Sequence, residues 1–407
     1  MTRPPYSATA GHFIWANFAY LIRGRLRSKD GFHPPADHPI PPDLFCVGAA
    51  TSADPAMDDA VIGYLNELGV RQVRVDFTYG DADNHVARLL DRLAAEGFTI
   101  MLHLVQPFSA ALEMLQPEAQ AEWRAFVGST LERFGNRIEF VEIGSTINRK
   151  SWAGYTLDGF LAMWGIAHDV TRERRIRLAG PNVTDFEPTY NIGILSILKS
   201  RGQLPDIHTN NLFVERCTEP ERDDHKILGH RFAALGGFRL LKKSYILRDI
   251  GAHFDVPDFV SPSAFWTLPR IERILDASEE KQADYIARYL ILCAASGAFR
   301  RVGWGPMICE REGLITDGVP GYPKLERITH YASFEGTALR VRPAFRALKT
   351  LAALIEGAHY ESCLDETDGV EVHAFSNREK QIHAAWVING RVAPLADLYS
   401  ADDLRQA

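Results

Sequence analysis

The strongest constraint on the fold of this chain is a serial alternation of short apolar runs and amphipathic segments between residues 44 and 355. In Gln72–Phe77, apolar residues alternate with polar ones, and Val86–Glu96 then places leucines at helical spacing before Gly97. Glycine readily adopts the left-handed backbone that ends a helix. This strand–helix order recurs about eight times, which favours a parallel sheet covered by helices.

The length of this repeating region favours closure of the sheet. Roughly 250–300 residues suit one closed barrel, and no Gly-x-Gly-x-x-Gly motif follows the first strand to indicate a dinucleotide-binding fold. We therefore predict an α/β protein, a (β/α)8 TIM barrel with a small C-terminal β appendage. The expected strands are 44–48, 72–77, 99–104, 138–143, 177–180, 206–209, 259–261 and 300–304, and the expected helices are 58–68, 86–96, 118–134, 156–172, 192–200, 231–250, 279–295 and 344–355.

The pattern changes at both ends of this region. Residues 370–375 and 381–387 alternate with period two around Asn377, Arg378 and Glu379, which predicts a hairpin. Residues 28–43 are rich in proline, histidine and aspartate and predict an irregular lead-in. The expected organisation is a lead-in over 1–43, a barrel over 44–356 and a β appendage over 357–407.

Charge and cysteine content exclude several classes of function. The net charge of -7 over 407 residues, with dispersed Lys and Arg, argues against a nucleic-acid partner. The five cysteines are far apart and show no metal-ligand or disulfide spacing. We expect no metal, no cofactor and a reducing, cytoplasmic location.

The N-terminal stretch over residues 12–27 is unusual. His12–Ile22 is apolar and aromatic, and Arg23, Arg25 and Arg27 follow it. It is too short to span a bilayer, and it lacks the features of a secretory signal. We favour a segment that packs on the barrel; the alternative is a peripheral membrane contact, with aromatic residues among the lipid headgroups.

Polar residues at the carboxyl ends of the strands are the candidate ligand contacts, because the active face of such a barrel lies at those ends. A strand-end histidine or asparagine can equally be a satisfied structural group. The candidates are Arg74, Asp76, His103, Ser145, Thr146, Asn148, Asn182, His208, Asn210, Ser263, Trp266 and Trp304.

Several segments, taken in order, carry a resemblance to a known family. Phe140–Asn148 resembles the fourth strand of the large clan of retaining glycoside hydrolases built on a (β/α)8 barrel. Arg74 matches that clan's second-strand arginine, Gly180–Phe186 is similar to its fifth-strand loop, and Gly297–Trp304 and Arg342–Lys349 resemble its eighth strand and closing helix. The resemblance covers roughly residues 44–390 and rests on the order of the segments.

The resemblance implies a pair of glutamates, the acid/base at the end of the fourth strand and the nucleophile at the end of the seventh. Thr146 and Ser263 stand at those two positions. A hydroxyl that does not titrate near neutral pH can serve neither role as a carboxylate does. The chain therefore resembles a member that lacks both catalytic glutamates.

Displaced carboxylates are the alternative source of catalysis. Glu142, Asp185, Glu215 and Glu310 are the candidates, and two of them would have to face each other across the cleft, about 5–5.5 Å apart for retention or 6.5–9.5 Å for inversion. We favour a structural role for Glu142, paired with Arg74, because buried carboxylates are commonly paired. Asp76 shares a strand face with Arg74 and is expected to form a local ion pair with it.

Tryptophans near the strand ends suit carbohydrate stacking. Trp304, with Trp152 and Trp266, is either a stacking platform or part of the core. The favoured function is recognition of a glycan or glycolipid at the barrel mouth without hydrolysis. The alternatives are an active glycosidase or transglycosidase with relocated carboxylates, and a scaffold in surface-glycan assembly.

Overall fold

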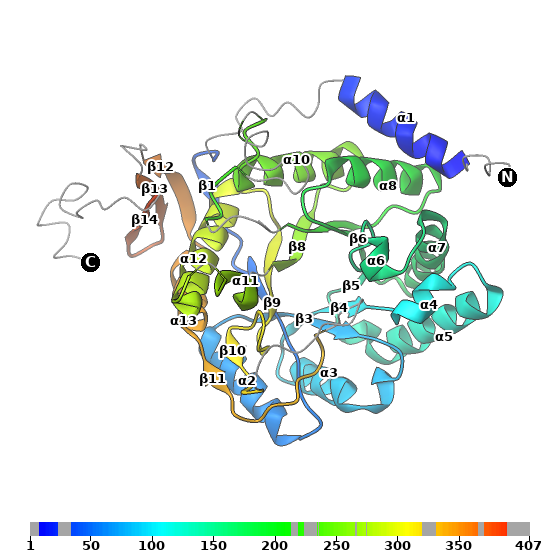
Figure 1. The fold of residues 1–407 in the computed structure, drawn as a ribbon, viewed down its shortest axis with the longest axis horizontal. Coiled ribbons are helices and arrows are strands. Elements are labelled where there is room, and N and C mark those ends of the chain that lie inside the picture. The colour runs from blue at the N-terminus through cyan, green and yellow to red at the C-terminus, as the bar shows by residue number, and fades with distance from the viewer. Residues whose placement is uncertain are drawn as a thin grey trace, which may run out of the picture.

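The protein is described by a computed structural model, which covers residues 8–22, 34–212, 219–223, 234, 236–264, 267–273, 275–319, 331–364 and 370–388. Its centre is a closed barrel of eight parallel strands in chain order, surrounded by helices (Figure 1). The barrel strands are β2 (Phe45–Gly48), β3 (Gln72–Phe77), β4 (Thr99–Leu104), β5 (Phe140–Ile143), β6 (Leu178–Thr184), β7 (Ile207–Asn211), β8 (Phe259–Ala264) and β9 (Arg301–Pro306).

Helices cover the outside of the barrel and bury its apolar outer face. Each long helix presents an apolar stripe to the strands, as Val86, Leu89, Leu90 and Leu93 do on α3. The helices are α1 (Ala8–Ile22), α2 (Ala56–Leu68), α3 (His85–Ala95), α4 (Phe108–Leu112), α5 (Pro117–Phe134), α6 (Lys150–Ala153), α7 (Leu157–Arg174), α8 (Pro188–Ser200), α10 (Leu240–His253), α11 (Leu268–Ile271), α12 (Ser278–Ser296) and α13 (Pro343–Ile355), with short 3-10 turns η1 (Asp81–Asp83) and η2 (Gly135–Arg137).

Local signals in the sequence fix several helix ends. The Thr156 hydroxyl accepts a hydrogen bond from the Gly159 amide at 3.0 Å, so it caps α7. Gly297 ends α12 in the left-handed conformation, with φ of 58°. The helix predicted over 231–250 corresponds to α10 from Leu240 onward, and residues 231–233 and 235 lie outside the described part of the chain.

A four-stranded antiparallel sheet lies beside the barrel, in the order β1 (His38–Pro39), β12 (His359–Leu364), β13 (Val370–Ser376) and β14 (Gln381–Val387). The predicted hairpin is β13 and β14. The lead-in is less irregular than expected, because its residues 38 and 39 pair with β12. A two-stranded ribbon, β10 (Ile315–Thr316) with β11 (Arg340–Val341), precedes α13.

Candidate functional site at the barrel mouth

The barrel interior is filled in two kinds of layer, because side chains alternate between the inside and the outside of each strand. One layer is a separate apolar cluster of residues from six barrel strands, in which Met101 pairs with Phe140 and Ala179 pairs with Ile207: Cys46, Met101, Phe140, Ala179, Ile207 and Val260. Two residues further along β4 and β5, on the same faces, come His103 and Glu142, which are also in register with each other. A polar layer therefore lies between the apolar layer and the carboxyl ends of the strands.

The guanidinium of Arg74 is the centre of this polar layer. Its Nε donates to Glu142 Oε2 at 3.0 Å, its Nη1 donates to Asp76 Oδ1 at 2.5 Å, and its Nη2 lies 2.6 Å from His103 Nδ1. All four side chains are buried. The two ion pairs predicted for Arg74 from the sequence are both present.

The ring of His103 is oriented by the backbone. Its Nε2 lies 2.7 Å from the Gly144 carbonyl oxygen, so this nitrogen must carry a hydrogen and donate it. Nδ1 is then free to accept from Arg74 Nη2, and Asp76 Oδ1 lies 2.9 Å away. Nδ1 therefore lies between the guanidinium of Arg74 and the carboxylate of Asp76.

Asp76 is held in its ionised form. Burial alone would raise the pKa of its carboxyl, but the charge of Arg74, the contact with His103 and a hydrogen bond from the Tyr331 amide, 2.8 Å from Oδ2, together hold this pKa well below its usual range. Tyr331 is distant from Asp76 in sequence. The hydrogen bond from its amide attaches the segment that follows β9 to strand β3. Both Asp76 oxygens are engaged.

Glu142 is fully buried and also engaged at both oxygens. Oε2 accepts from Arg74, and Oε1 accepts from Asn182 Nδ2 at 2.6 Å. Asn182 reaches this position because the register of β6 against β7 shifts between Pro181 and Val183 and Asn182 has a positive φ of 58°. The strand was predicted over 177–180; instead β6 bulges at Asn182 and continues to Thr184, and the bulge redirects the Asn182 side chain.

The loop after β5 is clamped to the end of β6. Asn148 Nδ2 donates to the Thr184 carbonyl at 2.8 Å, and the Thr184 amide donates back to Asn148 Oδ1 at 2.9 Å. Thr146 is half-buried, with φ of 51°, and its Oγ1 accepts from Thr184 Oγ1 at 3.1 Å. Ser145, next to it, is also half-buried. Thr146 thus presents a hydroxyl where the resemblance expects a carboxylate.

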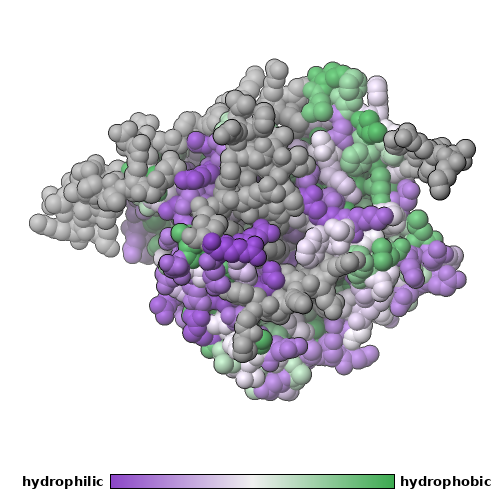
Figure 2. All heavy atoms as spheres, in the orientation of Figure 1, coloured by the Kyte–Doolittle hydropathy of each residue, from purple (hydrophilic) through white to green (hydrophobic). Residues whose placement is uncertain are grey.

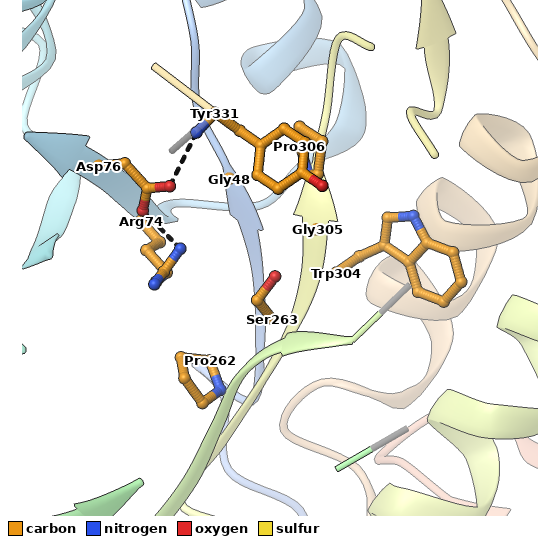
Figure 3. Close-up of a pocket in the computed structure, with 9 residues that line it drawn as sticks. All are labelled: Gly48, Arg74, Asp76, Pro262, Ser263, Trp304, Gly305, Pro306 and Tyr331. Carbon is orange, nitrogen blue, oxygen red and sulfur yellow. Dashed lines mark hydrogen bonds and ion pairs between the residues drawn. The ribbon is translucent and has the colours of Figure 1, made fainter. Parts of the chain in front are cut away.

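A small pocket lies beside Arg74 and Asp76 (Figure 3). Its cavity volume is about 10 Å³, which is room for about one water molecule, and Ser263 from β8 lies in its wall. Tyr331 and Pro306 form its rim. Trp266, two residues after β8, lies outside the described residues.

The other candidate carboxylates lie in separate networks. Asp185 Oδ2 accepts from Arg149 Nη2 at 2.5 Å, beyond β6. Glu310 Oε1 accepts from Arg342 Nη2 at 3.2 Å, beside α13. Glu215 lies outside the described residues. The described contacts therefore join Glu142 to Asp76 through Arg74, and they do not join it to Asp185 or Glu310.

Three of the predicted ligand contacts face the helices instead of the barrel interior. His208 Nε2 lies 2.8 Å from Asn191 Oδ1 on α8, and burial lowers the pKa of His208 to about 3. Asn210 Oδ1 accepts from Asn191 Nδ2 at 3.0 Å. The Trp304 indole is buried near the Tyr285 ring of α12, and Trp304 also lines the small pocket beside Arg74 (Figure 3). Strand alternation explains these placements. Side chains point alternately into and out of the barrel, and each of these three residues is next along its strand to a residue whose side chain points inward.

Sequence reasoning missed Tyr331 and Thr184. Tyr331 acts through its backbone amide, for which no side-chain signal exists. Thr184 is a second hydroxyl beside Thr146, and its position in the loop after Asn182 was the available signal. Within the described ranges, no group of His, Cys, Asp and Glu side chains is arranged to hold a metal ion.

Comparisons with known proteins define the fold of this chain. No family model matches the sequence, and no curated protein matches it either. Among solved structures, the chain is similar to a family 39 glycoside hydrolase from Bacteroides cellulosilyticus WH2, with a TM-score of 0.59, 14% identity, and coverage of 86% of this chain and 71% of that one.

Two further structures are similar to the same extent. The GH39 enzyme from Xanthomonas axonopodis pv. citri has a TM-score of 0.55, 15% identity, and coverage of 88% and 74% of the two chains. A GH30 endoxylanase from Clostridium papyrosolvens C71 has a TM-score of 0.54, 10% identity, and coverage of 86% and 82%. At such low identity, the similarity establishes that the chain has the (β/α)8 barrel fold found in these glycoside hydrolases.

Proposed function

We infer that this chain is a glycoside-hydrolase-like protein that binds a carbohydrate at the barrel mouth and does not carry out retaining hydrolysis. The observation that carries this proposal is the pairing of two features. Thr146 and Ser263 place hydroxyls at the ends of β5 and β8, and the nearby carboxylates of Asp76 and Glu142 are bound by Arg74. A general acid needs a carboxyl that can release and regain a proton near the working pH.

The electrostatics of the polar layer support this proposal. Asp76 stays ionised because its pKa is held low, so it has no proton to give to a leaving group. Glu142 is fully buried and each of its oxygens accepts from a donor, which holds the carboxylate away from a ligand at the barrel mouth. If either carboxylate left Arg74, the buried positive charge of its guanidinium would be poorly compensated. These carboxylates therefore do not readily leave Arg74 to bind a substrate.

Polar groups that converge on a concave, partly apolar site are the usual means of recognising a sugar. Ser263 lines the pocket, and the strand ends around it supply asparagine and threonine groups. The similar solved structures include an endoxylanase and a beta-xylosidase, so xylo-oligosaccharides are a suitable first ligand class.

The test is calorimetric titration of the full chain with xylo- and gluco-oligosaccharides, together with turnover assays on aryl xylosides and aryl glucosides. We expect binding without turnover. Ser263→Phe places a bulky ring among the strand ends at the barrel mouth and should weaken binding, whereas Ser129→Phe, at an exposed position on α5, should not. Turnover that is abolished by changing a single carboxylate would overturn the proposal.

The second candidate function is hydrolysis with relocated carboxylates. The observation in its favour is that Asp76 and Glu142 approach each other closely enough to share one guanidinium. Under this hypothesis Asp76→Asn or Glu142→Gln removes turnover of aryl glycosides while the oligosaccharide still binds. An absence of turnover in the wild-type chain excludes it.

A further inference from the structure

Helix α1 is attached to the outside of the barrel by one face. Phe13 meets the Tyr190 ring edge-on at 5.6 Å, and Asn17 Nδ2 donates to the Thr189 carbonyl of α8 at 2.9 Å. Tyr20 is buried and packs edge-on against His253 at the end of α10 at 5.1 Å. These contacts fix the orientation of α1 on the barrel, as the sequence favoured.

The opposite face of α1 is apolar and exposed. Its five side chains recur at helical spacing and cover a sector of about 120°. Trp15 and Phe18 lie with ring centroids 5.8 Å apart. Figure 2 shows hydrophobic surface gathered over this helix. The outer face of α1 consists of Ile14, Trp15, Phe18, Leu21 and Ile22, which are exposed by 62%, 67%, 52%, 47% and 68%.

Charge in the sequence distinguishes this surface from an ordinary apolar patch. The helix has no Asp, Glu, Lys or Arg. Arg23 follows its last residue directly, and Arg25, Arg27 and Lys29 come within the next six positions, before any acidic residue. The chain as a whole has a net charge of -7, so this positively charged stretch is opposite in sign to the rest of the chain.

We propose that the outer face of α1 binds the surface of a lipid bilayer that carries anionic headgroups. Aromatic and aliphatic side chains suit the boundary between headgroups and acyl chains, and the basic residues that follow suit anionic lipid. The helix has 15 residues, too few to cross the hydrocarbon core, so it lies in the plane of the surface. Across the described residues, no helix is long and apolar enough to cross a membrane.

A lipid surface accounts for this face better than a second copy of the chain. A two-fold contact between copies would bring identical patches together. The uncharged faces could then pack, but the face contains no acidic side chain that would complement the basic residues that follow it in the sequence. An anionic bilayer satisfies the apolar face and the basic stretch at once.

The experiment is flotation of the full chain with vesicles of phosphatidylcholine alone or of phosphatidylcholine and phosphatidylglycerol in equal amounts. We expect binding to the anionic vesicles that weakens as salt rises. Trp15→Ser with Phe18→Ser should reduce this binding about a hundredfold or more. Replacing Arg23, Arg25 and Arg27 by Gln should reduce it by about fivefold for each charge.

Trp152→Ser is the matched control, because Trp152 is exposed by 45% on α6 and lies away from α1. It should float like the wild type. Circular dichroism should show unchanged folding for the Trp15 and Phe18 variant, since both side chains are exposed. Equal flotation of that variant and the wild type would overturn the proposal, and so would a dimer of the wild-type chain that this variant converts to a monomer. Oligosaccharide binding should not change, so this test is independent of the proposed function.

Discussion

At the scale of single residues, the polar layer is a buried network in which one guanidinium binds two carboxylates and a histidine. Arg74 contacts Asp76, His103 and Glu142 at once, and Asn182 completes the coordination of Glu142. Each of these side chains forms a hydrogen bond or an ion pair with another one, so the layer is a structural network. Breaking one member of such a network costs more than the contact itself gains, because a buried partner is left unsatisfied.

Glu142 allows the structural and catalytic roles to be separated. Glu142→Ala should lower the free energy of unfolding by about 3–5 kcal/mol, because Arg74 then keeps only one carboxylate. Glu142→Gln should cost less, since its amide oxygen can still accept from Arg74 or Asn182. Urea denaturation followed by circular dichroism measures both. Equal stability of the Ala variant and the wild type would contradict the structural role.

Glu356, at the end of α13, gives a pH-dependent prediction. Burial raises the pKa of its carboxyl to about 7, although the Phe45 amide donates to its Oε1 at 2.8 Å; nearby Asp43 adds to the rise. The folded state therefore binds this proton more tightly than the unfolded state, so the contribution of Glu356 to stability is full below pH 4.5 and is lost as pH rises through 7.

Glu356→Gln keeps the oxygen that accepts from Phe45 and removes the charge. It should stabilise the protein at pH 8 by about 1–3 kcal/mol and change little at pH 4.5. Thermal denaturation at the two pH values tests this. A gain of the same size at both would show that titration of this carboxyl is not the cause.

At the scale of elements, Gly144 shapes the loop between β5 and α6. Its φ is 101°, and a Cβ on it would lie 2.5 Å from the Pro181 carbonyl oxygen. Gly144→Ala should therefore cost at least about 2 kcal/mol, since backbone strain adds to a clash with backbone. It should also weaken glycan binding, because the His103 hydrogen bond to the Gly144 carbonyl and the Thr146 hydroxyl both depend on this loop.

Gly69→Ala is the matched control for this substitution. Gly69 also has a positive φ, 78°, at the end of α2, but a Cβ there would meet nothing within 4 Å. Gly69→Ala should lower the free energy of unfolding by about 1 kcal/mol, because of the backbone conformation alone. Chemical denaturation compares the two variants, and equal costs would show that the approach of Pro181 is unimportant.

At the scale of the whole molecule, the small sheet ties both ends of the chain to the barrel. His38 in β1 pairs with Tyr360 in β12, and Tyr360 and Phe375 are fully buried. His38 Nε2 also lies 3.2 Å from the Ala294 carbonyl oxygen of α12. The barrel and the sheet therefore share part of one core, and we expect them to unfold together.

Differential scanning calorimetry should show one transition for the full chain, with equal calorimetric and van't Hoff enthalpies. Removing residues 357–407 should lower the midpoint of thermal unfolding, because His38 and the α12 surface lose their cover. Two separate transitions in the full chain would contradict a shared core and would support independent domains divided near residue 357.

The sequence by itself determined the barrel fold and the bounds of some of its strands. The strands expected at 72–77 and 99–104 match β3 and β4 to the residue, because in both the apolar positions and the flanking loop signals agree. The ion pairs of Arg74 followed from strand alternation, which puts Arg74 and Asp76 on the same face. The hairpin near the C-terminus followed from its period of two.

The tertiary structure alone decided which strand-end residues meet. His208 and Trp304 were expected at the mouth, but pleating turns them toward α8 and α12. A position near the end of a strand does not reveal whether its side chain points into or out of the barrel. Asn182 reaches Glu142 only through a bulge, and the Tyr331 amide reaches Asp76 across 255 positions of sequence. Local pattern determines which elements form, because propensity and periodicity act between near neighbours. Contacts across a barrel form only when the whole sheet closes, and this closure cannot be predicted from any one local segment.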